Sequence, residues 1–185
     1  MGQVRLAAAC IGCPAGTARI FLGATLGAIL FAWLGLSMVQ AAGIEVRGVL
    51  KVIDGDTLEL QGQRLRLQGV DAPELAQRCW LKTRLYDCGA VARTALLDLT
   101  AGSEVVCRTL GPGPQGTTLA HCTAGGYDLA EGMAYTGWAL PNGAASARYR
   151  TVEADARKAR RGLWRDRFVA PWDWRAGERL PEEAN

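Results

Sequence analysis

The sequence has almost no surplus of one charge. It carries 21 Lys and Arg residues against 18 Asp and Glu residues, and its first 41 residues hold only Arg5 and Arg19 and no acid. The rest of the chain is therefore close to neutral. A protein that binds nucleic acid through bulk electrostatics would show a strong basic excess. Any recognition of phosphate must be local, through a few placed side chains.

Histidine is equally scarce, and internal repeats and low-complexity segments are absent. The one histidine, His121, lies beside Cys122 with no serine or cysteine nucleophile pattern, so it predicts a structural or surface role. The chain also lacks the regular strand–helix alternation of a doubly wound sheet. These absences argue against His-dependent nucleophilic catalysis and against an α/β fold.

Charge is missing altogether from residues 20–39, which form one apolar run. Val39 and Ala41 then stand at the −3 and −1 positions of a cut before Ala42, as in a cleaved secretory signal. Twenty apolar residues also suffice to span a bilayer, so residues 1–41 are predicted to be a signal peptide or a membrane anchor. We expect the remainder to be exported, either periplasmic or secreted, with the membrane as a partner only if the leader is uncleaved.

The six cysteines fall into two groups. Cys10 and Cys13 make a C-x-x-C in the leader, which is a weak metal or redox signal without a second pair. The other four lie in the exported part, where an oxidising compartment predicts two disulfides. Four cysteines allow three pairings. We favour the two local pairs, Cys79 with Cys88 and Cys107 with Cys122.

The pattern of apolar residues predicts a small barrel with helices. Residues 44–69 alternate apolar and polar side chains around two tight-turn signals, which predicts a three-stranded meander. Further strands are expected over 103–109 and 118–122, and residues 71–88 are expected to be irregular. Helices are predicted over 89–99, around Leu129 and Met133 up to Gly137, and over 147–167. Five strands with about three helices predict an α+β OB-fold, that is, a five-stranded barrel.

Two short acidic segments with two carboxylates each, and an arginine between them, fall within 21 residues of this region. The segments are Asp54-Gly55-Asp56 and Asp71-Ala72-Pro73-Glu74, and the arginine is Arg66. Each segment alone is typical of a turn or loop. Together they place acids at two adjacent ends of the barrel. Ligand sets made only of oxygen favour calcium or magnesium over zinc.

These segments resemble the paired motifs of the staphylococcal thermonuclease family. V-I-D-G-D-T begins at Val52, R-L-Q-G-V-D-A-P-E begins at Arg66, and A-R-K-A-R-R-G-L-W follows from Ala156. The likeness extends over about residues 46–164. It implies an OB domain over residues 42–168, with 169–185 as a C-terminal tail that packs on the domain.

The resemblance implies a calcium-dependent nuclease that hydrolyses phosphodiester bonds of DNA or RNA. By position, Asp56 and Asp71 match the direct calcium ligands, and the main-chain carbonyl of Ala72 matches a third. Asp54 matches a carboxylate near the metal but not bound to it, and Glu74 matches the group that orients or deprotonates the attacking water. A cation and a prepared water are what attack on a phosphodiester requires.

Arg66 matches one of the family's two phosphate-neutralising arginines, but the second is missing. The family usually carries D-R/K-Y-G-R before its last strand, and Thr117 stands where that arginine belongs. Losing one charge donor costs roughly two to three orders of magnitude in rate, so reduced activity is predicted. Arg64, on the same strand face as Arg66, and Arg108 are the candidate substitutes for the missing clamp.

Two other functions stay open from the sequence. Thr117 favours a non-catalytic OB module that binds nucleic acid or an oligosaccharide, since that barrel face serves both. The family likeness also allows an accessory protein of polysaccharide export. The intact acids favour the enzyme, and we expect it to act as a monomer.

Overall fold

The computed structural model describes residues 43–48 and 50–183. The predicted leader, with Cys10, Cys13 and the cleavage site at Val39 and Ala41, lies outside the described residues. Within the described part of the chain, no helix combines the length and the apolar composition that crossing a bilayer requires.

The described strands form one large sheet and two small pairs. The large sheet contains β1 (Glu45–Arg47), β2 (Leu50–Val52), β3 (Thr57–Leu60), β4 (Gln63–Leu67), β8 (Val105–Pro112), β9 (Thr118–Ala124) and β10 (Tyr127–Asp128). The small pairs are β5 (Val70–Asp71) with β11 (Leu140–Pro141), and β6 (Cys79–Leu81) with β7 (Arg84–Tyr86). The helices are α1 (Cys88–Thr100), α2 (Leu129–Thr136), α3 (Ala147–Lys158) and α4 (Pro171–Arg175), with 3-10 turns at Pro114–Gly116, Gly162–Arg165 and Pro181–Glu183.

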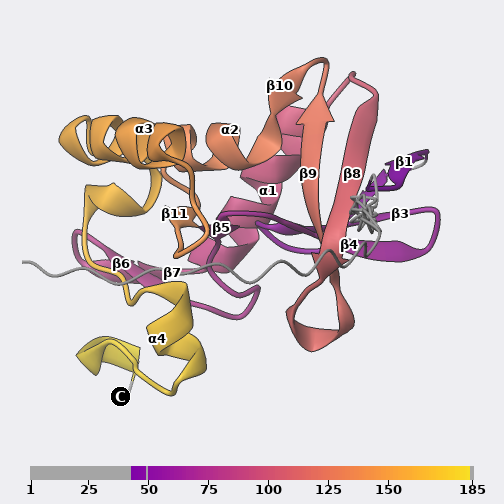
Figure 1. Ribbon diagram of the computed structural model, residues 1–185. Helices are drawn as coiled ribbons and strands as arrows, with labels where there is room; N and C mark the ends of the chain where they lie inside the picture. The colour runs from indigo at the N-terminus through magenta and orange to yellow at the C-terminus, as the bar shows by residue number, and fades with distance from the viewer. Residues whose placement is uncertain (1–42, 49, 184–185) are drawn as a thin grey trace, which may run out of the picture. The chain divides into compact units, whose positions relative to one another are not determined.

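The large sheet curls on itself as an OB-like barrel does (Figure 1). Its strand order is β1-β8-β9-β4-β3-β2, with β10 added beside β9. The two ends of this order, β1 and β2, are separated along the chain only by residues 48 and 49, so one segment pairs with both β8 and β3. β4 and β9 are parallel, and the other pairs are antiparallel. With β1 and β2 counted as one strand, this is the predicted five-stranded barrel.

The barrel core follows the alternation seen in the sequence. Leu58, Leu60 and Leu65 have no exposed surface, and they share one cluster with Ala92 and Leu96 of α1. Burying a leucine stabilises a fold by roughly 1.5–3 kcal/mol. The alternating pattern of β3 and β4 therefore fixes which strand faces meet α1 and which face outward.

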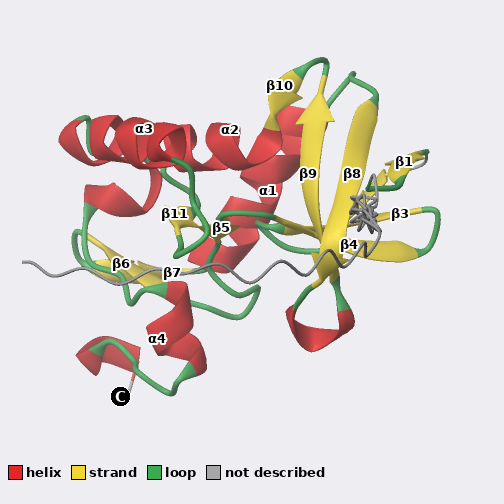
Figure 2. Cartoon of the chain, viewed as in Figure 1, coloured by secondary structure: helices red, strands yellow, loops and turns green. Residues whose placement is uncertain are grey.

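Both favoured disulfides are present. Cys107 and Cys122 are directly opposite one another in the β8–β9 ladder, and a disulfide joins them. A second disulfide joins Cys79, the first residue of β6, to Cys88, the first residue of α1. The connection between β8 and β9 carries the Pro114–Gly116 turn, which Figure 2 draws in red at the bottom of the hairpin.

The helices begin and end at identifiable signals. The Asp128 side chain caps α2 by accepting hydrogen bonds from the N–H groups of Ala130 and Glu131, and Gly137 ends it with a φ of 78°. The Asp128 carboxylate also lies 3.1 Å from Nε2 of His121, so the histidine has the structural setting that the sequence suggested. Helix α2 packs against α3 in Figure 1.

Two expectations about secondary structure were wrong, and one further helix was not expected. The last long helix ends at Lys158 rather than near residue 167, because Arg160 and Gly162 both adopt a φ of 53°. Residues 71–88 contain the β6–β7 hairpin instead of being wholly irregular. The C-terminal tail holds a fourth helix, α4, which lies below β6 and β7 in the view of Figure 1.

Candidate active site

The first acidic segment forms a tight turn that only glycine allows. The N–H of Asp56 donates to Oδ1 of Asp54 at 3.0 Å, so Asp54 acts as a turn residue. A Cβ at Gly55 would lie 2.7 Å from Cβ of Ala72 and 2.8 Å from Cβ of Ala92. The turn is therefore pressed against the second acidic segment and against α1.

Asp56 and Asp71 come together as a buried pair bridged by Arg66. They are only 2% and 5% exposed. Nη2 of Arg66 donates to Oδ2 of Asp56 at 2.6 Å and to Oδ1 of Asp71 at 2.9 Å. Asp56 also accepts hydrogen bonds from the Thr57 hydroxyl and from the N–H of Ala72, both at 2.9 Å. The structure thus unites four of the predicted site residues, although Ala72 contributes its N–H here and its predicted carbonyl role remains a prediction.

Because Asp56 is buried, its ionised form depends on nearby positive charge. Loss of contact with water raises the pKa of Asp56 to about 8, and the neighbouring Arg66 guanidinium opposes that rise. The nearby charges of Asp54 and Asp71 push in the same direction as burial. A second cation at this place would favour the ionised carboxylate, as a metal ligand requires.

Glu74 lies near this pair, and hydrogen bonds between its backbone and Gln77 hold it in place. Its N–H donates to Oε1 of the fully buried Gln77, and the N–H of Gln77 donates back to the Glu74 carbonyl at 2.7 Å. A Cβ at Gly89 would come within 1.8 Å of that carbonyl, so the segment touches the first turn of α1. The side chain stays 25% exposed and is therefore open to solvent.

A second guanidinium, which the sequence did not predict, completes the site. Nη1 of Arg175 donates to Oδ1 of Asp71 at 2.9 Å and to Oε1 of Glu74 at 2.7 Å, and Nη2 donates to Oδ2 of Asp71. The hydrogen bond to Asp71 raises the pKa of Arg175 further above its ordinary value. Pro171 at the start of α4 and two tryptophans are the local signal of an ordered tail. No spacing links that tail to the acids.

The two arginines considered as substitutes for the missing clamp lie elsewhere. Arg64 is exposed on β4 opposite Glu59, and Arg108 is exposed on β8 opposite His121. Neither is among the ion-pair partners of Asp56, Asp71 or Glu74 within the described residues. Their role as a second clamp stays a prediction that the geometry does not favour.

The carboxylates suit a hard divalent cation held with help from other ligands. Their donors are all oxygen, and oxygens of Asp56 and Asp71 already converge on one positively charged nitrogen. Among residues 43–48 and 50–183, no three or more His, Cys, Asp and Glu side chains form a metal-holding group by themselves. Ions such as calcium and magnesium commonly complete their shells with main-chain carbonyls, water and substrate phosphate. The residues present fit such an open site.

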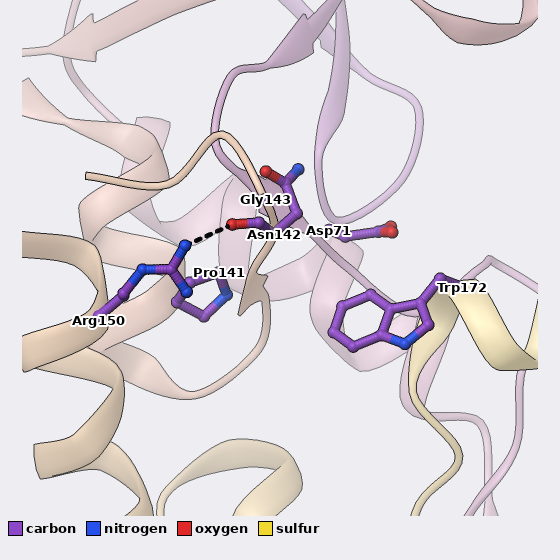
Figure 3. Close-up of a pocket in the computed structure, with 6 residues that line it drawn as sticks. All are labelled: Asp71, Pro141, Asn142, Gly143, Arg150 and Trp172. Atoms are coloured by element: carbon purple, nitrogen blue, oxygen red, sulfur yellow. Dashed lines mark hydrogen bonds between the residues drawn. The ribbon is translucent and has the colours of Figure 1, made fainter. Parts of the chain in front are cut away.

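A cavity of about 400 Å³ adjoins Asp71. In Figure 3 the Trp172 indole lies beside the Asp71 carboxylate, with Arg150 and Pro141 across the view. Nη2 of Arg150 donates to the Asn142 carbonyl at 3.1 Å. The cavity therefore has an aromatic ring beside Asp71 and a guanidinium on its other side, groups that can contact a base and a phosphate.

Comparison with known proteins identifies the family. The family model described as staphylococcal nuclease homologue matches residues 64–166, more than half of the chain. The chain belongs to the staphylococcal nuclease family.

Relatives within the staphylococcal nuclease family carry different names. The chain is 35% identical over 159 residues to a micrococcal nuclease of Shigella flexneri, covering 72% of this chain and 83% of the relative. It is 33% identical over 150 residues to Protein ParB of Escherichia coli, covering 76% and 85%. It is 31% identical over 150 residues to the succinoglycan biosynthesis protein ExoI of Rhizobium meliloti (strain 1021), covering 76% and 75%. The family model's match includes Arg66, Asp71 and Glu74 and ends before α4.

Proposed function

We propose that this chain is an exported, calcium-dependent nuclease that hydrolyses phosphodiester bonds in DNA or RNA. The observation that carries the proposal is the buried pair Asp56 and Asp71, bridged by Arg66 and flanked by Glu74. This is the residue set that the family motifs imply. Membership of the family and the names of several relatives support a nucleic-acid substrate.

Each side chain has a separate task in this proposal. Asp56 and Asp71, with the carbonyl of Ala72, would hold calcium, which as a Lewis acid stabilises charge on the phosphoryl group. Glu74 accepts a proton from the attacking water, because its carboxylate is open to solvent. Arg66 donates hydrogen bonds to a phosphate oxygen as negative charge grows there.

Calcium binding is expected to fail in Asp56→Asn and in Asp71→Asn. An amide keeps the shape and part of the hydrogen bonding of the carboxylate but removes the charge that a hard cation needs. Calorimetric titration of purified protein with calcium should show one site in the natural protein and none in either variant. Circular dichroism of the variants should match that of the natural protein. Unchanged affinity in both variants would mean that the acids only build turns.

The proposed activity is tested by a zymogram on DNA and RNA, with calcium and with chelator. Cleavage that needs calcium supports the nuclease. Absence of cleavage on both polymers, with calcium binding intact, would favour the non-catalytic OB module or the polysaccharide-export role. The specific observation that favours the polysaccharide-export role is the likeness to the succinoglycan biosynthesis protein.

The export part of the proposal concerns the leader. Two disulfides in the described domain fit an oxidising compartment. N-terminal sequencing of periplasmic or secreted protein is expected to begin near Ala42, because signal peptidase cuts after a small residue. Recovery of full-length chain in the membrane fraction would show that the leader acts as an anchor.

A further inference from the structure

The Arg175 guanidinium lies between the carboxylates of Asp71 and Glu74, to which different tasks are assigned above. Arg175 contacts Asp71, a proposed calcium ligand, and Glu74, the proposed base, with Nη1 shared between them at 2.9 and 2.7 Å. A phosphate undergoing attack must sit within reach of both the cation and the water. Arg175 therefore lies beside both groups that a phosphate under attack would have to approach.

The Arg175 side chain is only partly enclosed by its carboxylate partners. The exposed fraction of the whole side chain is 30%, so solvent can reach part of it. A guanidinium carries five N–H donors in a planar fork that matches the oxygens of a phosphate as well as those of a carboxylate. If Asp71 held a divalent cation, its attraction for Arg175 would weaken and the Arg175 donors would become available to a phosphate.

Position 117, where the family's motif carries its second phosphate-binding arginine, has no charge in this chain. Thr117 is only 6% exposed, and its hydroxyl donates to the Pro114 carbonyl at 2.7 Å. The side chain is thus used inside its own turn. A site with Arg66 alone would face the phosphate with a single guanidinium.

Helix α4 is anchored firmly enough to hold Arg175 in place. Nε2 of the fully buried Gln77 donates to the Val169 carbonyl at 2.7 Å, which ties the Glu74 segment to the residues just before α4. Pro171 and Leu180 are buried on either side of the arginine. Trp172 of the same helix lines the cavity beside Asp71 (Figure 3). The tail therefore forms one wall of the site.

We propose that Arg175 is the second phosphate-binding arginine of this site, supplied by α4 in place of strand position 117. The proposal rests on the proposed function and deepens it. It makes Arg175 a catalytic residue, because its donors touch the substrate phosphate.

The kinetic test compares five variants on DNA with calcium present. Arg175→Ala is expected to lower kcat by about 100-fold or more, the usual loss for one charge donor in a transition state. Arg175→Lys should recover part of the rate, because the charge stays and the fork is lost. Thr117→Arg should restore at least about 10-fold in the Arg175→Ala background and change the natural protein little. Arg179→Ala is the matched control, since Arg179 stacks on Trp174 and hydrogen-bonds carbonyls of the same tail.

The binding test does not depend on turnover. The Glu74→Gln protein is titrated with a short single-stranded DNA oligonucleotide in calcium, at several salt concentrations. Adding Arg175→Ala should weaken binding and reduce the slope of log K against log salt by about 0.7, the value for one lost contact to single-stranded phosphate. A residue that only braced the tail would leave the slope unchanged.

The outcomes separate this proposal from the proposed function. If the natural protein cleaves neither polymer, the proposed function fails, and the salt slope still decides whether Arg175 binds phosphate. Unchanged slope and unchanged kcat in Arg175→Ala would overturn the assignment. A higher kcat together with tighter calcium binding would also overturn it, since Arg175 would then be an internal cation that competes with the metal.

Discussion

Glu74→Gln is expected to lower kcat by on the order of 1000-fold while calcium affinity and thermal stability stay close to those of the natural protein. A positioned base contributes about 10²–10⁴ in rate, and an amide cannot accept the water's proton. The backbone hydrogen bonds between Glu74 and Gln77 do not involve the substituted carboxylate. The measurement is steady-state cleavage of DNA alongside calorimetry with calcium.

Glu131→Gln provides a matched control for that substitution. Glu131 is 28% exposed against 25% for Glu74, and it pairs with Arg148 as Glu74 pairs with Arg175. It lies on α2, outside the acidic segments. Equal rate losses in the two variants would show that the effect is not that of a base, and the role assigned to Glu74 would have to be abandoned.

Arg66→Ala is expected to damage both catalysis and the stability of the calcium-free protein. The rate should fall by roughly 100- to 1000-fold, because a donor to the phosphate is lost. Asp56 would also remain buried without its guanidinium partner, and breaking such a buried pair costs about 3–5 kcal/mol. Urea unfolding with chelator present measures that loss. Added calcium should restore much of the stability but not the rate.

The stability deficit of Arg66→Ala is expected to depend on pH. The pKa of Asp56 is raised to about 8 by burial, so the folded protein binds a proton that the unfolded chain has released. A raised folded pKa contributes stability at low pH that is lost as the pH rises through it. Removing Arg66 raises the pKa of Asp56 further, so the deficit of Arg66→Ala should stay level between about pH 5 and 7 and widen as the pH rises through about 8. A deficit that shrinks over this range would mean that Asp56 is not the group left unpaired.

Local patterns in the sequence were enough for the barrel and for most of the acidic site. Alternation of leucine with polar residues in β3 and β4 marks the side that faces the core, which is visible in Leu58, Leu60 and Leu65. The Asp56 and Asp71 pair could be predicted because Asp56 directly precedes β3 and Asp71 lies four residues after the end of β4, the strand that pairs with β3. The end of α3 could not, because it depends on a left-handed backbone at Arg160, a residue type that rarely adopts it.

Arg175 could not be found from the sequence for a different reason. Its partner Asp71 lies 104 residues earlier, and the link between them depends on Gln77 and on the burial of Pro171 and Leu180. Periodicity describes one element at a time and says nothing of which elements meet. The sequence showed that position 117 lacks the family's arginine. It did not show that the Arg175 guanidinium reaches Asp71 and Glu74.

The separation between Asp71 and Arg175 also sets an order of events during synthesis. A ribosome adding about 5–20 residues per second needs roughly 5–20 s to make the 104 residues that part them. Throughout that interval the emerging chain has its acids and Arg66 but no guanidinium from α4. The site therefore stays without its second guanidinium until α4 has been made and has packed against the Glu74 segment.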